Sequence, residues 1–301
     1  GILFNATRIR QMITHDDITQ LPKIRFSGFS DIREMPGAEL IEALGDSYHH
    51  VGLDDTIVVT RSNKRANIFN QGIRNMVLDR EEELESGDML MIVKNNYYWM
   101  EEERKKIKER QLSEERKVKS GKFNTLANHT VQSNEVSSHE IPAFLANGDR
   151  AKVMKVSRRI ELYGFHFATL LLKFPDYDNY ELEATVLLDT LTSEASALTH
   201  DQQEQLFHKI EEDYQDIPLK ADRMKAIRQD PYFNALQVKF AYAVTCHKAQ
   251  GGQWSHVYVD QGYMTDEMLT PDYIHWLYTA FTRATEMLYL VNWPKTQVEG
   301  E

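Results

Sequence analysis

Two segments near the C-terminal end of the chain combine residue types that suit phosphate binding. The first, residues 245–254 (TCHKAQGGQW), follows an apolar, strand-like run. It offers hydroxyl, imidazole and ammonium groups to phosphate oxygens, and its two glycines let backbone N–H groups approach a charged ligand closely. Ligand sites in doubly wound sheets form where strands end, so this position favours a binding loop. A strand followed by an ordinary polar loop would have the same pattern.

The second segment, residues 276–284 (WLYTAFTRA), has apolar residues at helical spacing. This spacing indicates a helix that faces a core, while Arg283 near its end can reach a phosphate across a cleft. A third polar segment, residues 61–63, directly follows the β-branched run TIVVT at 56–60, which is typical of a strand buried on both faces.

The first two segments together, and in this order, resemble the last motifs of superfamily-one helicases of the RecD and Dda type, and residues 60–63 are similar to the family's nucleic-acid-contacting segment after a central strand. The helicase pattern is T-x-H-K-x-Q-G followed further along by Y-T-A-x-T-R-A, within the UvrD-like C-terminal motor region. Residues 87–91 and 146–149 are similar to the entry strands of the SH3-like barrel that RecD-type enzymes insert into their second motor domain. The resemblance covers most of the chain; the charged insert near 101–140 and an acidic segment at 199–231 lie outside it.

The resemblance implies roles for eight residues. Arg283 would be the catalytic arginine finger that reaches the γ-phosphate of ATP. Gln250 and Gly251 would sense the nucleotide, and Gln253 stands where many relatives carry a glutamate that touches the ribose. The residues implied in contacting the phosphates of single-stranded DNA are Arg61, Asn63, Thr245 and His247. The implied function is the C-terminal motor half of an ATP-dependent DNA helicase or translocase that moves 5′ to 3′.

The phosphate-binding loop of such a motor is missing from the sequence. Gly121-Lys122 is the only Gly-Lys pair, and Phe123 and Arg116 occupy positions where the G-x-x-x-x-G-K-[ST] pattern needs Ser or Thr and Gly. We therefore expect ATP with Mg²⁺ to be bound mainly by an N-terminal motor domain outside this chain, and this chain alone to be inactive. Since it opens at Gly1 without methionine, we expect a fragment of a longer protein.

The predicted elements form an α/β motor domain interrupted by a barrel. Residues 38–44 followed by Gly45 have the pattern of a short helix, Thr270 and Pro271 that of a helix start, and 236–245 that of one strand. Short strands with turn signals predict a small antiparallel, SH3-like β-barrel inserted in a RecA-like parallel-sheet domain; they lie at 89–93, 141–144, 151–157, 165–174 and 181–188. The expected domains are 1–86 and 232–301 for the motor, 87–198 for the barrel and 199–231 for the acidic helical segment.

Aromatic, cysteine and histidine side chains elsewhere offer weaker candidates for chemistry. Residues 97–99 (YYW) suit either base stacking or barrel packing. The single cysteine, Cys246, excludes a zinc site built on paired cysteines. The pair His49-His50 is typical of an exposed turn, so we expect no metal site.

Composition bounds the function. A net charge of -11 excludes a histone-like binder, so affinity for nucleic acid must come from local Lys and Arg clusters. With no long apolar run and no leader pattern, we expect a cytoplasmic protein without membrane contact. Two alternatives remain open: a non-catalytic DNA-binding or interaction module built on a motor remnant, and a subunit of an exonuclease V-like complex with a nuclease or repair partner.

Overall fold

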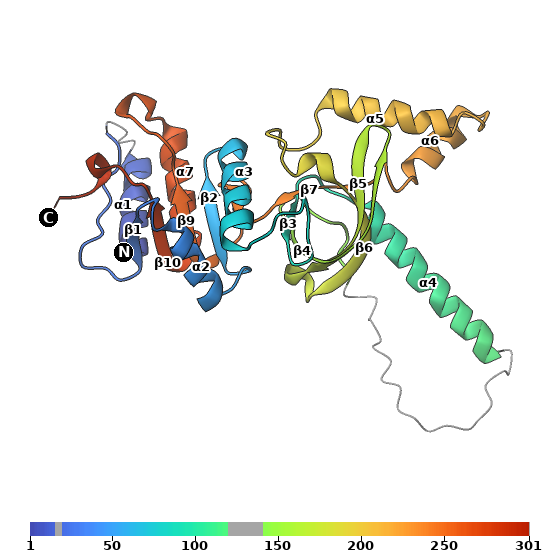
Figure 1. Cartoon of the computed structure of the whole chain (residues 1–301), viewed down its shortest axis with the longest axis horizontal. Coiled ribbons are helices and arrows are strands. Elements are labelled where there is room, and N and C mark those ends of the chain that lie inside the picture. Colours follow the sequence, from blue (N-terminus) through green and yellow to red (C-terminus); the bar gives the residue numbers. More distant parts are fainter. Residues whose placement is uncertain (16–19, 120–140, 301) are drawn as a thin grey trace, which may run out of the picture. The chain divides into compact units, whose positions relative to one another are not determined.

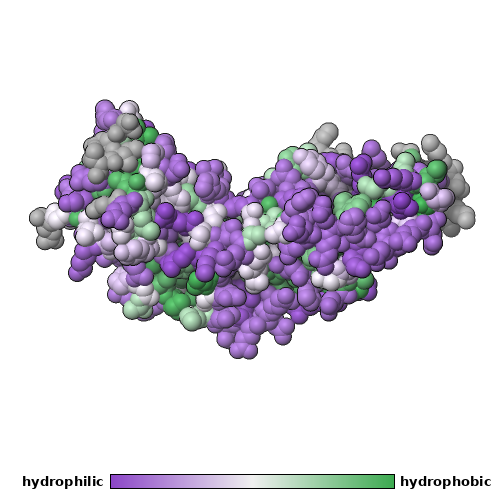
Figure 2. Space-filling view, turned by 90° about the horizontal axis from the view of Figure 1, so that it is seen from above, coloured by the Kyte–Doolittle hydropathy of each residue, from purple (hydrophilic) through white to green (hydrophobic). Residues whose placement is uncertain are grey.

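A computed structural model (Figure 1) describes residues 1–15, 20–119 and 141–300. The chain divides into two compact units. The sheet unit comprises residues 1–90, 192–196 and 239–301, and the barrel unit comprises residues 91–191 and 197–238. Figure 2 shows one face of the molecule, where hydrophilic residues predominate and apolar residues form separate patches.

The sheet unit is built on a parallel sheet with strand order β1-β10-β9-β2-β8. The strands are β1 (Ile32–Met35), β2 (Thr56–Thr60), β8 (Ala243–Thr245), β9 (Trp254–Asp260) and β10 (Ala284–Val291). All residues of β2 are buried, so the sheet is covered on both faces, which the β-branched run predicted. The α/β class with a parallel sheet is confirmed.

Helices flank this sheet. They are α1 (Ile2–His15), α2 (Leu40–His50), α3 (Asn63–Gly72), the π-helix η1 (Ile73–Val77), α7 (Pro271–Phe281) and the short 3₁₀ helices η4 (Asp266–Met268) and η5 (Lys295–Gln297). Helices α1 and α7 lie side by side (Figure 1). The predicted start of α7 is confirmed, since the Thr270 side chain accepts a hydrogen bond from the backbone N of Tyr273 at 3.2 Å.

The predicted end of a helix at Gly45 is wrong. Helix α2 continues through Gly45 to His50 because the residues beyond the glycine pack against the sheet. Ser47 is buried, and its hydroxyl lies 2.7 Å from the hydroxyl of Tyr258 on β9. This tertiary contact outweighs the weak local preference of glycine for a helix end.

A closed five-stranded barrel is the second architectural element. Its strands are β3 (Met89–Ile92), β4 (Arg150–Leu162), β5 (Phe165–Phe174), β6 (Tyr180–Leu187) and β7 (Leu236–Phe240). The pairs β4–β5 and β5–β6 are antiparallel, but β6–β7 is parallel, so the prediction of a wholly antiparallel barrel is wrong. Residues 141–144 form no strand; Leu145 instead makes an isolated bridge to Asn96.

The apolar run at 236–245 is two strands rather than the predicted one. Its first part, β7, closes the barrel, and its last part, β8, joins the parallel sheet. At Ala241 and Tyr242 the chain passes from one to the other, and the buried hydroxyl of Tyr242 donates to a carboxylate oxygen of Asp88 at 2.8 Å. Hydrophobicity reports burial, and both halves are buried, so the pattern could not reveal the change of sheet.

The described residues of the barrel unit include three α-helices and the short η2 (Pro175–Tyr177) and η3 (Leu188–Thr190). The described part of the charged insert is helix α4 (Tyr98–Lys119); residues 120–140 lie outside the described residues. The acidic segment forms α5 (His200–Asp213) and α6 (Lys220–Arg228), which pack through Leu206, Ile210 and Ile227 on Phe165 and Phe167 of the barrel. Residues 232–238, expected with the motor, also lie in the barrel unit. No helix in the described ranges has both the length and the apolar character needed to cross a bilayer.

Candidate functional site

Strand register places two predicted segments together at the carboxyl edge of the sheet. Thr60, the last residue of β2, is level with Thr245, which ends β8, and with Asp260, which ends β9. The segments that follow β2 and β8 are therefore neighbours, and the backbone N of Cys246 donates to the carbonyl of Thr60 at 3.1 Å. This edge is where ligand sites form in parallel α/β sheets.

Arg61 is exposed at this edge. Its guanidinium lies 5.5 Å from the ring centroid of Tyr273 and donates to the sulfur of Met264. Within the described part of the chain no carboxylate pairs with it. The stacking orients the cation while its charge stays available to an anion.

Asn63 begins α3, whose N-cap Ser62 accepts a hydrogen bond from the backbone N of Arg65 at 3.2 Å. The Asn63 amide is half-buried and donates to the carbonyl of Glu194 at 3.1 Å. Sequence reasoning missed the neighbouring pair in which Arg65 donates twice to the carboxylate of Asp260, both at 2.7 Å. This bidentate pair fixes α3 to the end of β9. The available signal in the sequence was an Asp at the end of the apolar run 257–259.

The segment after β8 turns tightly. The carbonyl of Thr245 accepts hydrogen bonds from the backbone N atoms of Lys248, at 2.9 Å, and Ala249, at 3.1 Å. Thr245 is half-buried, and His247 is exposed. Burial lowers the pKa of the Lys248 ammonium and raises the pKa of the Cys246 thiol to about 12, so this cysteine stays a neutral thiol.

The remaining predicted residues lie toward the opposite, amino edge. The first residues of β9 and β10, Trp254 and Ala284, are register partners. Gln253 and Arg283 directly precede them, so both lie where these strands begin, and the carbonyl of Arg283 accepts from the backbone N of Trp254 at 2.9 Å. Residues 246–253 thus run from the carboxyl edge to the amino edge.

The Arg283 guanidinium binds the loop that precedes β9. It donates to the carbonyls of Gly252 at 2.8 Å, Ala249 at 3.5 Å and Thr279 at 3.0 Å. The residue is half-buried. In this state Arg283 connects the end of α7 to the loop, a structural role that sequence reasoning did not anticipate.

The loop that Arg283 holds carries the other predicted nucleotide contacts. Gln250, Gly251 and Gln253 are exposed. Gly251 has a φ of +85°, which favours glycine, and a Cβ on Gly252 would lie 2.4 Å from the buried ring of Trp254. The glycines therefore serve the shape of the loop whether or not a ligand binds.

The structure separates the eight predicted residues into two groups. Those implied in DNA binding gather at the carboxyl edge; they are Arg61, Asn63, Thr245 and His247. Those implied in nucleotide binding and catalysis gather toward the amino edge; they are Gln250, Gly251, Gln253 and Arg283. Their functional roles stay predictions.

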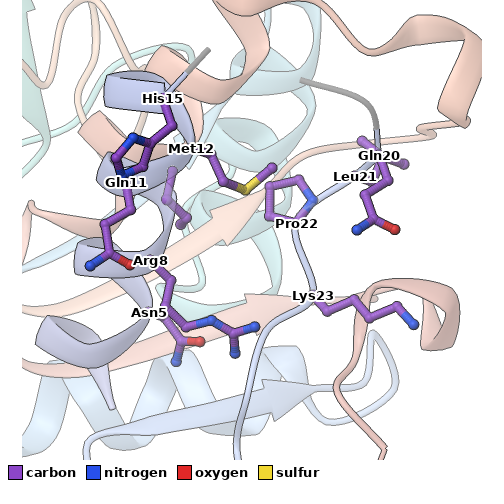
Figure 3. A pocket seen from close by; sticks show the side chains of 10 residues that line it. Asn5, Arg8, Gln11, Met12, His15, Gln20, Leu21, Pro22 and Lys23 are labelled. Carbon is purple, nitrogen blue, oxygen red and sulfur yellow. The ribbon is translucent and has the colours of Figure 1, made fainter. Parts of the chain in front are cut away.

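The sheet unit has a cavity and a histidine pair apart from these two edges. A cavity of about 360 Å³ lies beside α1, between Met12 and Pro22 (Figure 3), and none of the eight predicted residues lines it. Arg8 on its wall is paired with Glu299. His49 and His50 are exposed in the last turn of α2 rather than in a loop. Among the described residues no three His, Cys, Asp or Glu side chains are grouped to hold a metal ion.

Comparison with known proteins gives one family. Residues 240–291 match the UvrD-like helicase C-terminal domain, which supports a superfamily-one helicase C-terminal region there. No curated protein matches. Among solved structures, the Pif1 helicase from Candida albicans is similar at 12% identity with a TM-score of 0.28; the match covers 98% of this chain and 56% of the helicase chain.

Proposed function

We propose that the sheet unit is the C-terminal, RecA-like motor domain of an ATP-dependent DNA helicase or translocase. The observation that carries the proposal is that the matched range 240–291 contains both motif segments, and that these segments meet in the structure through the bond from Arg283 to the carbonyl of Gly252. The RecA-like and SH3-like descriptions of sheet and barrel, and movement 5′ to 3′, belong to the same proposal through the sequence resemblance.

In this proposal the carboxyl edge binds the phosphates of single-stranded DNA. Arg61 supplies a charge that no carboxylate of the described residues pairs with, and the hydroxyl of Thr245 and the imidazole of His247 come from the adjacent strand end. These groups recognise phosphate and not base, so binding is independent of sequence.

The amino edge contacts a nucleotide that is held mainly elsewhere. Without a phosphate loop, the side chains present suit sensing and not tight binding: Gln250 and Gln253 are exposed amides, and Arg283 has its donors on carbonyls. ATP with Mg²⁺ would supply the phosphoryl transfer that powers movement. For Arg283 to serve as the arginine finger, it must exchange loop carbonyls for phosphate oxygens.

The two edges are connected by residues 246–253, which supports a coupling route. If Arg283 releases Gly252, the loop from Gly252 back to Ala249 loses contacts that hold its shape. The other end of this segment, at Cys246, is bonded to Thr60 beside the DNA-binding edge. A change at the nucleotide edge then shifts the DNA-binding edge through a short, continuous piece of backbone.

One observation favours a second candidate, a non-catalytic module. The Arg283 contacts described above are made within its own unit and are complete without a nucleotide. A scaffold that holds a DNA-binding surface would keep the same contacts.

DNA-stimulated ATP hydrolysis separates the two candidates. The activity is measured for this chain alone and for the same residues joined to a phosphate-loop motor domain, each with and without single-stranded DNA. Hydrolysis in the joined protein alone is the expected result. Absence of hydrolysis from both, with DNA binding retained, would favour the non-catalytic module.

A further inference from the structure

The barrel unit contains a pocket of about 240 Å³, apart from both edges of the parallel sheet. It lies where β3 ends and α5 and β7 begin. Its lining residues include Leu206 of α5, together with Lys94, Tyr97 and Phe233. Gln237 of β7 also lines it.

Two aromatic rings at this pocket are exposed and backed by other rings. Tyr97 is 54% exposed and stacks on Phe144, with ring centroids 4.8 Å apart and an interplanar angle of 27°. Phe233 is 37% exposed and meets Phe207 edge-on at 6.3 Å. By contrast, Trp99 is buried and donates to the carbonyl of Asn234 at 2.9 Å, so it packs. Rings fixed in place lose little freedom on stacking with a ligand.

Gln237 presents an unused donor to the pocket. The residue is only 9% exposed, and its Oε1 accepts a hydrogen bond from the backbone N of Leu198 at 2.9 Å. Its Nε2 has no acceptor in the described part of the chain. This Nε2 is not one of the fully buried polar atoms without a partner, so it is open to the pocket, where a ligand carbonyl can accept its hydrogen bond.

The charge of the pocket selects an anionic ligand. No Asp or Glu of the described ranges lines it, although the chain carries a net charge of -11. The Lys94 ammonium is held against the wall by the Oε1 of Gln203 at 3.1 Å and pairs with no described carboxylate. Aromatic rings, an amide donor and an unpaired cation in one pocket match a nucleotide of a polyanionic strand.

We propose that this pocket binds one base of single-stranded DNA. The base stacks on Tyr97, the more exposed of the two rings, with Phe233 beside it. A base carbonyl accepts from the Nε2 of Gln237, and Lys94 faces a neighbouring phosphate. The proposal rests on the proposed function for the identity of the polymer. Its residues belong to another unit, so it extends DNA contact from the sheet to the barrel.

The test compares two fluorescent oligonucleotides of equal length, oligodeoxythymidylate and an abasic strand, by anisotropy. The wild-type chain is expected to bind the oligodeoxythymidylate about tenfold more tightly, since stacking is worth roughly 1–3 kcal/mol per base. Tyr97→Ala should remove most of this difference and leave abasic binding unchanged. Met154→Ala, an exposed truncation on β4, is the matched control and should change neither.

Gln237→Glu tests the donor. It keeps an acceptor for the backbone N of Leu198, removes the Nε2 donor and adds a negative charge, so we expect a similar loss. Gln202→Glu is its control, because the Gln202 side chain serves the capping box of α5 outside the pocket. If Gln237→Glu unfolds, Phe233→Ala tests the pocket instead, through its second exposed ring, and should lower the affinity for the oligodeoxythymidylate and not that for the abasic strand.

Equal wild-type affinity for the two strands, or no loss with Tyr97→Ala, overturns the pocket. Loss with Lys94→Gln alone, equal for both strands, also overturns it, since that describes an anion site. Arg61→Ala tests the sheet edge separately. If Arg61→Ala weakens DNA binding and Tyr97→Ala does not, the pocket is refuted and the proposed function stands. If only Tyr97→Ala weakens DNA binding, the sheet edge is refuted and the pocket stands.

Discussion

At the carboxyl edge of the sheet, Arg61 stacks on Tyr273 and has no carboxylate partner in the described chain, whereas toward the amino edge Arg283 gives its donors to carbonyls of Gly252, Ala249 and Thr279. Both arginines come from motifs that the sequence associates with phosphate. The first is ready to bind an anion; the second must break contacts before it can. The comparison shows that two arginines predicted to bind phosphates can differ in the free energy that binding requires, because Arg283 must first break hydrogen bonds and Arg61 need not.

The largest expected effect is at Arg283. In the chain joined to a phosphate-loop domain, Arg283→Ala should reduce DNA-stimulated ATP hydrolysis by about 10³ to 10⁵, since an arginine finger stabilises the charge of the transition state. Steady-state phosphate release measures it. Thr279→Ala, one turn earlier on α7, is the control, because it leaves the carbonyl to which Arg283 donates. Normal turnover in Arg283→Ala would remove the finger from the proposal.

Gly252→Ala should destabilise the loop at the amino edge without changing the charge of the chain. The new Cβ would meet the buried ring of Trp254 at 2.4 Å, and overpacking of this kind costs about 1–3 kcal/mol of unfolding free energy. Urea unfolding measures it. Gly72→Ala is the control: Gly72 is helical with open space around it, so stability should stay equal or rise. Equal curves for the two variants would contradict the packing described for this loop.

Arg61→Ala tests the carboxyl edge, and it should weaken the binding of single-stranded DNA. Removal of one phosphate contact weakens single-strand binding several-fold and reduces the slope of log affinity against log salt by about 0.7. Anisotropy titrations at several salt concentrations give both values. Arg33→Ala, which removes an exposed arginine from β1, should leave the slope unchanged. A loss confined to one base sequence would argue against a phosphate contact.

The smallest effect concerns the strand between the two edges. Burial lowers the pKa of His256 on β9, whose Nδ1 lies 2.8 Å from the hydroxyl of Ser47. The folded pKa is thus below the unfolded value near 6.5, so the unfolded state binds more protons as pH falls through that range and the fold loses stability. His256→Gln should show a smaller drop in melting temperature between pH 7 and pH 5. Parallel pH profiles for the two proteins would refute this.

Local patterns predicted what depends on neighbours in sequence. The buried strand at 56–60 and the capped start of α7 at Thr270 are in the structure as expected. The division of 236–245 between two sheets was missed, because both halves are equally apolar. The separation of Arg61 from Arg283 onto opposite edges was also missed, since it follows from strand register and not from the motifs.

The passage from β7 to β8 limits how the barrel can be moved between proteins. A domain inserted in a loop can be excised by cutting at two nearby points, but this barrel takes its closing strand from residues that lead directly into the parallel sheet. The Asn70 side chain donates to the carbonyls of Phe240 and Ala243 on both sides of that passage, at 3.2 and 2.9 Å. A chimera cut at residue 198 would separate the barrel from β7. The barrel would then stay open, and β8 would lose the residues that lead into it.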